Sequence, residues 1–496
     1  MYLKKKRLKR LTNFRLTMLK IDRRELVFLI VVLLLCIFLR FYHLSEKPLL
    51  PDEWGVIIPR YDTMITSVKN FLLLPTQDYW DKNPKFNYIG PAAIVHINTG
   101  MHSVTTPLTG WLVSFGLMAF GKNALGARFM PNIFSILSIF LFYLIVRNAF
   151  SRKHAILSTL LLSFYSFYLT SIRNTPAFEP IVVFFFLLAA YFVLFWQKYR
   201  FWRIGWLASA ALMLFSNFPK AILLLGIMFI WEIYVLYKNE LNAIKFFNLT
   251  TFYTASFIPS ILWGIIRANV YNLNPLWMFE HAFARIPYEP FRILELLYSY
   301  SSTKQGAFLI FLGIYGLFLY VLSLFAQKQE INNSSKLNTL LAIMFITIPV
   351  SLLLGRQPGA WSHSMTAIPI VFFASVALYK MLKDITEGKY FRYLGAFLAN
   401  WFYILIVKNM GDLITEVPRT DSATISLYKQ VFMQILNSRL VILEFSILFV
   451  FVTSSILIAK YGKVDAQLKS MLNASLAFTV LIFIVHTMYL VISDTI

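Results

Sequence analysis

Residues 38–53 read FLRFYHLSEKPLLPDE, and this stretch decides how the chain is organised. An apolar run that begins near residue 26 ends at Arg40, and the adjacent carboxylates Asp52 and Glu53 follow after one short loop. The run is long enough for a membrane helix, which needs roughly 20 mostly apolar residues. An acidic pair at the mouth of such a helix predicts chemistry at the membrane surface.

The composition places the whole chain in the same class. Apolar residues make up 58% of its 496 residues and charged residues only 14%, and the mean hydropathy is +0.65. Soluble globular domains are far more polar. The sequence therefore predicts an all-α, polytopic integral membrane protein. About 13 stretches are apolar enough to span a bilayer: residues 26–42, 129–146, 155–171, 180–196, 204–218, 221–237, 246–266, 306–326, 338–354, 364–379, 393–407, 440–459 and 473–492.

The basic residues predict the topology. Residues 1–25 carry a dense cluster of Lys and Arg before the first span, which the positive-inside rule places in the cytoplasm as a tail, followed by a signal-anchor helix. Later Lys and Arg residues gather in loops on alternate sides, so the net charge of +23 sets orientation and does not indicate nucleic-acid binding. This pattern places the loops 43–127, 267–305 and 408–439, with the C-terminus, outside the cytoplasm.

The domain organisation is simple. We expect residues 26–496 to form one integral-membrane domain without a soluble C-terminal domain. Residues 107–121 are apolar but short for a span, which favours an interfacial or re-entrant helix in the first outer loop. The single cysteine, Cys36, lies inside the first span, so neither a disulfide framework nor a Cys-based metal site is available.

Ionisable residues are scarce in the middle of the expected spans. Glu232 and Glu444 lie near span ends, and we interpret both as carboxylates solvated at the interface rather than parts of a proton relay. Acidic and basic groups crowd the outer ends instead. This mixture predicts a polar cleft rather than an ion conduit.

Three segments resemble the N-terminal half of the GT-C glycosyltransferases that use polyprenyl-phosphate sugars. They are residues 40–53, residues 105–158 (TTPLTGWLVSFGLMAFGKNALGARF and onward) and residues 171–192 (SIRNTPAFEPIVVFFFLLAAYF). Within that superfamily the chain looks most like the aminoarabinose and lipopolysaccharide-core transferases of the bacterial cell envelope, and less like the protein O-mannosyltransferases. The resemblance covers residues 26–225, and a weaker match by pattern continues at residues 362–378.

The resemblance implies specific site residues. Family members carry an Asp-Glu pair after the first helix, a proline-leucine step before an amphipathic helix, and an Arg with an acidic residue before the fourth helix. The matching residues are Asp52, Glu53, Pro107, Leu108, Arg173 and Glu179. Two positions depart from the family: the acidic residue is a glutamate rather than an aspartate, and Thr105-Thr106-Pro107 replaces a cation-Pro-Pro step.

The absence of a cation at residues 105–107 affects how this chain can bind the donor phosphate. If the family's lysine normally grips that phosphate, this chain needs other cations, for which His102, Lys220 and Arg356 are candidates. Arg173 and His363 complete the expected phosphate-binding set, because Arg suits bidentate phosphate contacts and a helix N-terminus near residue 363 favours an anion. Alternatives stay open: an Arg173–Glu179 salt bridge, Lys220 as an interfacial anchor, and a structural His363.

Glycosyl transfer from a lipid phosphate needs a base for the acceptor proton and cations for the departing phosphate. We predict Asp52 as the general base of an inverting single displacement, while Glu53 either orients the acceptor or helps to hold a metal. Glu179 would help orient the substrate. Adjacent carboxylates raise each other's proton affinity, which suits a base near neutral pH. Asp52, Glu53 and Glu179 could also coordinate a hard divalent cation such as Mg²⁺ or Mn²⁺ through oxygen, and the sequence leaves metal dependence open.

The sequence thus predicts an inverting glycosyltransferase of the plasma membrane. It would move a sugar from a polyprenyl-phosphate carrier, such as undecaprenyl phosphate, to a lipid or glycan acceptor on the extracytoplasmic face, among membrane lipids. The alternative is a lipid-linked glycan flippase or a polymerase-like protein without a catalytic base. The sugar, the acceptor, metal dependence and the oligomeric state are not determined by the sequence.

Overall fold

The structure is a computed structural model, and it describes residues 22–49, 53, 57–74, 107–173, 179–195, 201–238, 242–272, 304–326, 332–354 and 363–386. Every regular element in these ranges is a helix, and none is a strand. The spans predicted at 393–407, 440–459 and 473–492 lie outside the described residues. The all-helical fold class is confirmed, and the number of about 13 spans stays a prediction.

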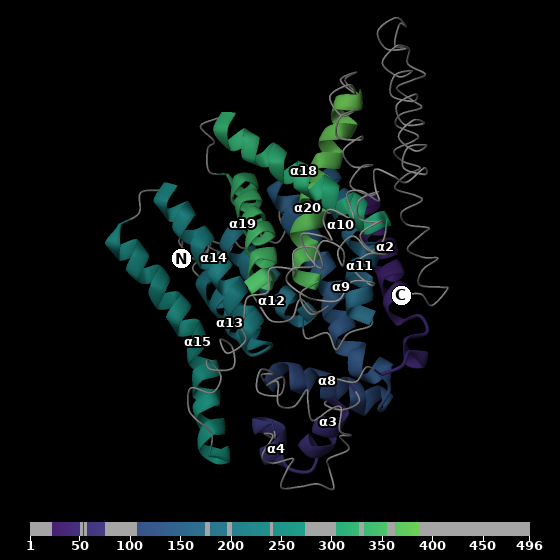
Figure 1. Cartoon of the computed structure of the whole chain (residues 1–496), viewed down its shortest axis with the longest axis vertical. Coiled ribbons are helices and arrows are strands. Elements are labelled where there is room, and N and C mark those ends of the chain that lie inside the picture. The colour runs from purple at the N-terminus through teal and green to yellow at the C-terminus, as the bar shows by residue number, and fades with distance from the viewer. Residues whose placement is uncertain are drawn as a thin grey trace, which may run out of the picture.

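The described helices form one bundle (Figure 1). Their bounds are α2 Arg23–Phe41, η1 Leu44–Glu46, α3 Ile58–Met64, α4 Val68–Leu73, α8 Pro107–Phe120, α9 Ala124–Ala149, α10 Arg152–Ser163, α11 Ser166–Arg173, α12 Glu179–Phe195, α13 Trp202–Leu214, α14 Phe218–Lys238, α15 Ala243–Tyr271, α18 Lys304–Ala326, α19 Asn333–Leu354 and α20 His363–Thr386.

Four segments in the described part of the chain are long and apolar enough to cross a membrane: Arg23–Glu46, Ala124–Ala149, Lys220–Lys238 and Ala243–Tyr271. Their outer faces leave large apolar side chains exposed, including Leu34 on α2 and Ile266 on α15. Such surfaces are stable in lipid, and helices satisfy their backbone hydrogen bonds internally there. The chain is therefore a multi-pass integral membrane protein.

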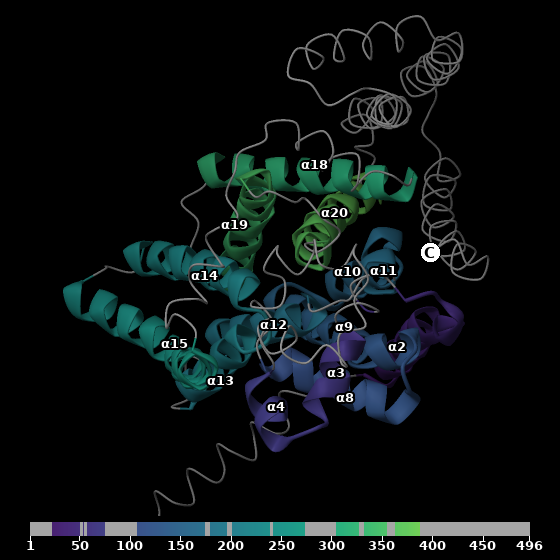
Figure 2. The same cartoon turned by 60° about the horizontal axis from the view of Figure 1, so that its bottom comes forward.

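The core is built around α9 and α12. The sequence EPIVVFFFLLAAYFVLF of α12 is apolar on every side, which is the pattern of a helix buried all round. α9 packs against α2, α8, α10 and α12, while α20 packs against α10, α18 and α19. Figure 2 shows α12 at the centre, with α14 and α15 at one edge of the bundle and α2 at the other.

One predicted span is divided. Residues 155–171 were expected to form a single helix, but α10 ends at Ser163 and α11 begins at Ser166, with Phe164 and Tyr165 between them. Serine hydroxyls compete for nearby backbone groups and so favour helix ends. The break places Arg173 at the end of a short separate helix.

Three short helices before α9 form a cap on the bundle. α3, α4 and α8 lie across one end of the bundle (Figure 1), and the helix expected at residues 107–121 is confirmed as α8. The backbone amide of Leu108 donates to the carbonyl of Phe215 at 3.1 Å, and the hydroxyl of Thr109 donates to the carbonyl of Ser216 at 2.5 Å. These bonds attach the start of α8 to the turn between α13 and α14.

The junction of α8 and α9 requires glycine. A Cβ on Gly116 would lie against the carbonyl oxygen of Gly126, well inside van der Waals contact, and a Cβ on Gly126 would collide with the carbonyl of Gly121. Both obstacles are backbone atoms, which cannot rotate away. The two glycines therefore let α8 approach the start of α9 closely.

We expect Gly126→Ala to destabilise the protein by about 1 to 3 kcal/mol, because overpacking displaces backbone at this junction. The measurement is thermal unfolding of the detergent-purified protein. Gly226→Ala is the matched control, since a Cβ there meets nothing within 4 Å and should leave the midpoint unchanged or raise it. Equal midpoints for the two variants would contradict this account of the junction.

Candidate functional site

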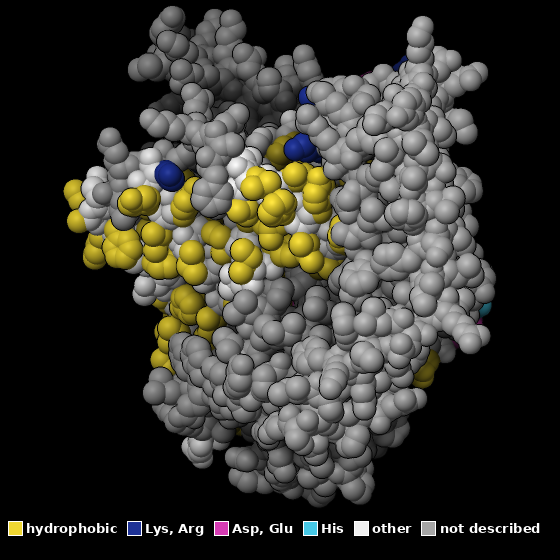
Figure 3. All heavy atoms as spheres, turned by 45° about the horizontal axis from the view of Figure 1, so that its top comes forward, with side chains coloured by type: hydrophobic (Ala, Val, Ile, Leu, Met, Phe, Trp, Pro, Cys, Tyr) yellow, Lys and Arg dark blue, Asp and Glu magenta, His cyan; other side chains and the backbone are white. Residues whose placement is uncertain are grey.

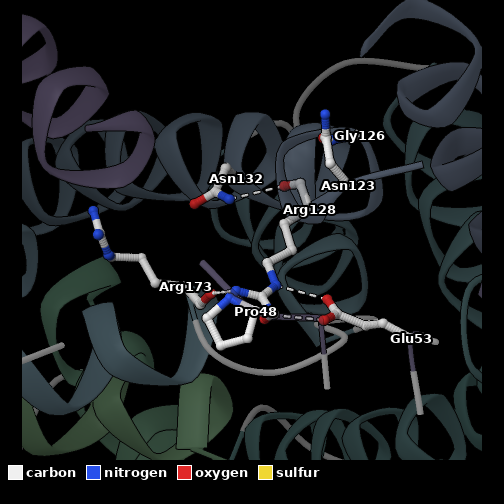
Figure 4. Close-up of polar contacts among 7 residues, drawn as sticks. All are labelled: Pro48, Glu53, Asn123, Gly126, Arg128, Asn132 and Arg173. Carbon is white, nitrogen blue, oxygen red and sulfur yellow. Dashed lines mark hydrogen bonds and ion pairs between the residues drawn. The ribbon is translucent and has the colours of Figure 1, made fainter. Parts of the chain in front are cut away.

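A buried ion pair joins Glu53, which follows α2 in the chain, to α9. Both guanidinium nitrogens on one edge of Arg128 contact the Glu53 carboxylate, Nε to Oε1 at 2.6 Å and Nη2 to Oε2 at 2.5 Å (Figure 4). The side chains are 1% and 0% exposed. Two parallel charge-assisted bonds fix the orientation as well as the distance. The residue that follows Asp52 is thus held at the start of α9.

The remaining donors of Arg128 hold two further segments. Nη2 donates to the carbonyl of Pro48 at 3.1 Å, and Nη1 donates to the carbonyl of Arg173 at the end of α11. One guanidinium therefore contacts Glu53 and Pro48 of the loop after α2 and the end of α11. This geometry places Pro48 and Glu53 beside the end of α11.

The start of α9 is itself well fixed. The side chain of Asn123 caps the helix by accepting from the amide of Gly126 at 2.8 Å, as Asn commonly does at this position. One turn beyond Arg128, the amide of the Asn132 side chain donates to the carbonyl of Arg128 at 2.8 Å. The guanidinium of Arg128 is therefore carried by a capped, buried helix turn.

Two more buried arginines surround this pair. Nη1 of Arg173 donates to the carbonyl of Leu39 at 2.6 Å, and Nε of Arg40 donates to the Ser135 hydroxyl at 2.9 Å. The Arg40 guanidinium lies 5.7 Å from the centre of the Tyr168 ring. Arg40, Arg128 and Arg173 are each buried, so the neighbouring helices α2, α9 and α11 each contribute one buried cation.

A second ion pair forms nearby. Nζ of Lys220 lies 3.0 Å from Oε1 of Glu179, joining the starts of α14 and α12. Both are among the residues predicted for the site, and the structure brings them together. Burial of the pair and its place beside the α8 attachment at Ser216 favour a fixed position for the ammonium group.

A further cationic group lies between the cap and α15. Arg60 on α3 and Arg267 on α15 are both buried and close enough to interact electrostatically. Nε of Arg267 donates to the carbonyl of Leu74 at 3.2 Å, and its guanidinium lies 5.3 Å from the centre of the Trp263 ring. Burial lowers the pKa of Arg60 to about 10, and nearby Tyr271 partly offsets this. Arg60 still carries its charge at neutral pH.

The structure describes only part of the predicted set. Glu53, Arg173, Glu179 and Lys220 lie at the same end of the bundle, as predicted. Asp52, His102 and Arg356 lie outside the described residues. His363 begins α20, but its side chain is not among those described, so their roles stay predictions.

Sequence reasoning missed Arg128, Arg60 and Arg267. Arg128 and Arg267 each lie next to the end of a predicted span, and that position was the available signal. The pairing of Arg128 with Glu53 and the closeness of Arg60 to Arg267 join segments that lie far apart in the sequence.

The proposed metal ligands can be tested against these contacts. Glu53 is neutralised by Arg128 and Glu179 by Lys220, so both carboxylates already have cationic partners. Among the residues that the structure describes, no three acidic, His or Cys side chains form a group suited to a metal. The described carboxylates do not fit a metal centre, and we derive no step through a metal ion.

Removing one partner of the buried pair should be costly. We expect Arg128→Met to destabilise the protein by about 3 to 5 kcal/mol, because the Glu53 carboxylate would be left buried without compensation. The check is a double-mutant cycle by thermal unfolding with Arg128→Met, Glu53→Leu and both together. We expect the double variant to recover much of the loss, whereas additive effects would show that the pair is not coupled.

Comparisons with known proteins agree with this architecture. Residues 104–263 match the family described as dolichyl-phosphate-mannose-protein mannosyltransferase. No curated protein matches the chain by sequence. The solved structure of ArnT from Cupriavidus metallidurans in the apo state shares the fold, with a TM-score of 0.52 and 13% identity over 81% of this chain and 74% of that chain. The form bound to undecaprenyl phosphate gives a TM-score of 0.50 and 13% identity, over 83% and 75% of the two chains. The family match and the shared fold confirm the predicted resemblance and indicate a membrane glycosyltransferase of the GT-C type.

Proposed function

We propose that this chain transfers a sugar from a polyprenyl-phosphate donor to a lipid or glycan acceptor at the outer ends of its helices. The observation that carries the proposal is the bidentate contact of Glu53 with Arg128 inside a group of buried arginines. This contact fixes the residue next to Asp52 beside several cations. A carboxylate base and a positively charged phosphate site are what such a transfer needs.

Asp52 acts as the general base. The acceptor hydroxyl attacks the anomeric carbon, its proton passes to the Asp52 carboxylate, and the bond from that carbon to the phosphate oxygen breaks. The anomeric centre inverts in this single displacement. Glu53 is a positioning residue in this proposal, because both of its oxygens contact Arg128 and that contact orients the neighbouring Asp52.

The departing phosphate gains negative charge as the bond breaks. The donor is a phosphodiester with one negative charge, and the leaving polyprenyl phosphate is a monoester with two. Preorganised cations therefore stabilise the transition state more than the ground state. We assign this role to Arg60 and Arg267, with Lys220, and to Arg173, Arg356, His102 and His363 as the sequence predicts. ArnT, which shares the fold, has been captured with undecaprenyl phosphate.

The positions of the charges support the proposed orientation. Arg152, Arg203, Lys238 and Lys245 lie at the helix ends opposite Glu53, and basic residues concentrate on the cytoplasmic side. We propose that the N-terminus is cytoplasmic, that the site faces outward, and that residues 26–496 form one integral domain. The acceptor, whether a lipopolysaccharide component or another glycan, is open.

We expect Asp52→Asn to lower transfer by about 100-fold to 10,000-fold, because an amide cannot take the acceptor proton. The assay is transfer of radiolabelled sugar from polyprenyl-phosphate donors to a membrane-lipid extract, with and without chelator. Glu46→Gln is the matched control, since Glu46 is exposed and pairs with His43 at 2.7 Å. Equal transfer by wild type and Asp52→Asn would remove Asp52 from the mechanism. Tight donor binding by the wild type without any sugar transfer would favour a flippase.

We expect Arg267→Gln and Arg60→Gln each to weaken donor binding by about tenfold or more, because each removes a charged donor from the phosphate. The first measurement is the affinity of each purified variant for the donor. The second is the rate of sugar transfer as a function of donor concentration. Arg152→Gln is the control, because Arg152 lies at the opposite end in an exposed pair with Asp22. Unchanged donor affinity in both variants would show that the donor phosphate does not bind at Arg60 and Arg267.

A further inference from the structure

A cavity lies at the end of the bundle opposite Glu53. It has a volume of about 360 Å³ and lies between α13, α14 and α15. α13 and α15 begin at this end, and α14 finishes there at Lys238. The cavity is thus separated from the proposed catalytic site by the length of the spanning helices.

Two cations stand at the rim of this cavity. Arg203 lies in the first turn of α13 and Lys245 in the first turn of α15, and both side chains line the cavity. The Arg203 guanidinium lies 4.9 Å from the centre of the Phe252 ring and 5.6 Å from that of Trp202. Cation–π contacts of this kind hold a guanidinium in place. The rim is therefore built for a negatively charged group.

A carboxylate lines the same cavity at greater depth. Glu232 lies on α14, about 9 Å along the helix from its end at Lys238 at a rise of about 1.5 Å per residue. Its Oε1 accepts a hydrogen bond from the buried Tyr253 hydroxyl at 2.9 Å. A carboxylate accepts several hydrogen bonds, so Glu232 can also accept from a ligand. Ionisable residues at such depth are costly, and function is the usual reason to retain them.

The surroundings indicate a lipid. Leu236 and Leu249 form apolar walls, and neighbouring helix faces expose large apolar side chains such as Ile230 and Phe247. Figure 3 shows hydrophobic side chains in a broad band, with Lys and Arg side chains above it. Basic pockets between membrane helices on the cytoplasmic side bind phospholipid head groups. A head group in the cavity could leave its acyl chains along this band.

We propose that this cavity binds a phospholipid head group that carries both a phosphodiester and a terminal ammonium group. Its phosphate lies between Arg203 and Lys245, and its ammonium group donates to Glu232. The order of charges in the cavity, cations at the rim and a carboxylate deeper, matches the order of opposite charges along such a head group. Phosphatidylethanolamine has this chemistry.

The test uses the detergent-purified full-length protein and native mass spectrometry. Dioleoyl phosphatidylethanolamine, phosphatidylcholine and phosphatidylglycerol with identical acyl chains are added in turn, and bound fractions are compared. Phosphatidylcholine keeps the positive charge but has no N–H donor, so it tests the contact with Glu232 directly. Free phosphoethanolamine, added as a competitor, distinguishes a lipid site from a site for the soluble head group.

We expect phosphatidylethanolamine to bind about tenfold more tightly than phosphatidylcholine, as one charge-assisted hydrogen bond predicts. Glu232→Gln should abolish this preference while leaving a weaker common affinity, and Arg203→Gln should weaken all three lipids. Lys153→Gln, an exposed cation on α10 outside the cavity, is the control. Each variant is first compared with wild type by thermal unfolding. Tyr253→Phe is a second variant that perturbs Glu232, because it removes the hydrogen bond that the Tyr253 hydroxyl donates to this carboxylate.

Three outcomes would overturn the proposal. They are equal binding of phosphatidylethanolamine and phosphatidylcholine by the wild type, an unchanged preference in folded Glu232→Gln, and displacement of the lipid by free phosphoethanolamine at matched concentration. None of these outcomes bears on sugar transfer at the opposite end, so the two proposals are tested separately.

Discussion

The buried contact between Glu53 and Arg128 is the constraint on which the end of the bundle that holds Glu53 depends. Glu53 lies between η1 and α3 in the chain, and a connecting segment alone does not hold a side chain in one place. A bidentate ion pair inside the protein supplies the missing rigidity because both charges are buried and lose their partner if either moves. Arg128 extends this constraint to Pro48 and to the end of α11.

The cap of short helices solves a second problem at the same end. Glycosyl transfer requires a site that admits a lipid donor, yet buried backbone groups must still be satisfied. Indole groups meet part of this need: Trp111 donates to the carbonyl of Phe71 at 2.8 Å and Trp263 donates to that of Leu72 at 3.2 Å. These bonds attach α4 to α8 and α15. Arg60 on α3 and Arg267 on α15 lie close together at the same cap, and we propose that they supply the cations that the family's usual proline step does not supply here.

The two ends of the bundle differ in how they use charge. At the end that holds Glu53, the cations Arg40, Arg60, Arg128, Arg173 and Arg267 are all buried. At the opposite end, ion pairs such as Glu25 with Arg147 at 2.5 Å join α2 to α9, while Arg203 and Lys245 line a cavity open to the surroundings. Glu232 was interpreted as a solvated interfacial carboxylate. Its hydrogen bond to Tyr253 places it in a structured cavity instead.

The sequence by itself determined the membrane class, the helical fold and the positions of most helices in the described ranges. These properties follow from local composition, because the length of an apolar run and the residues at its ends decide whether it spans a bilayer. The resemblance to GT-C transferases also rested on local motifs, and it anticipated Glu53, Arg173 and Glu179 at one end.

Only the tertiary structure decided which charges become partners. No local pattern pairs Glu53 with Arg128 or Lys220 with Glu179, because these contacts join helices far apart in the chain. The division of residues 155–171 into two helices, the approach of Arg60 to Arg267 and the cavity around Glu232 depend likewise on packing. The sequence determines which segments enter the membrane, whereas the choice of partners follows from burial, where a charge must find compensation wherever the fold provides it.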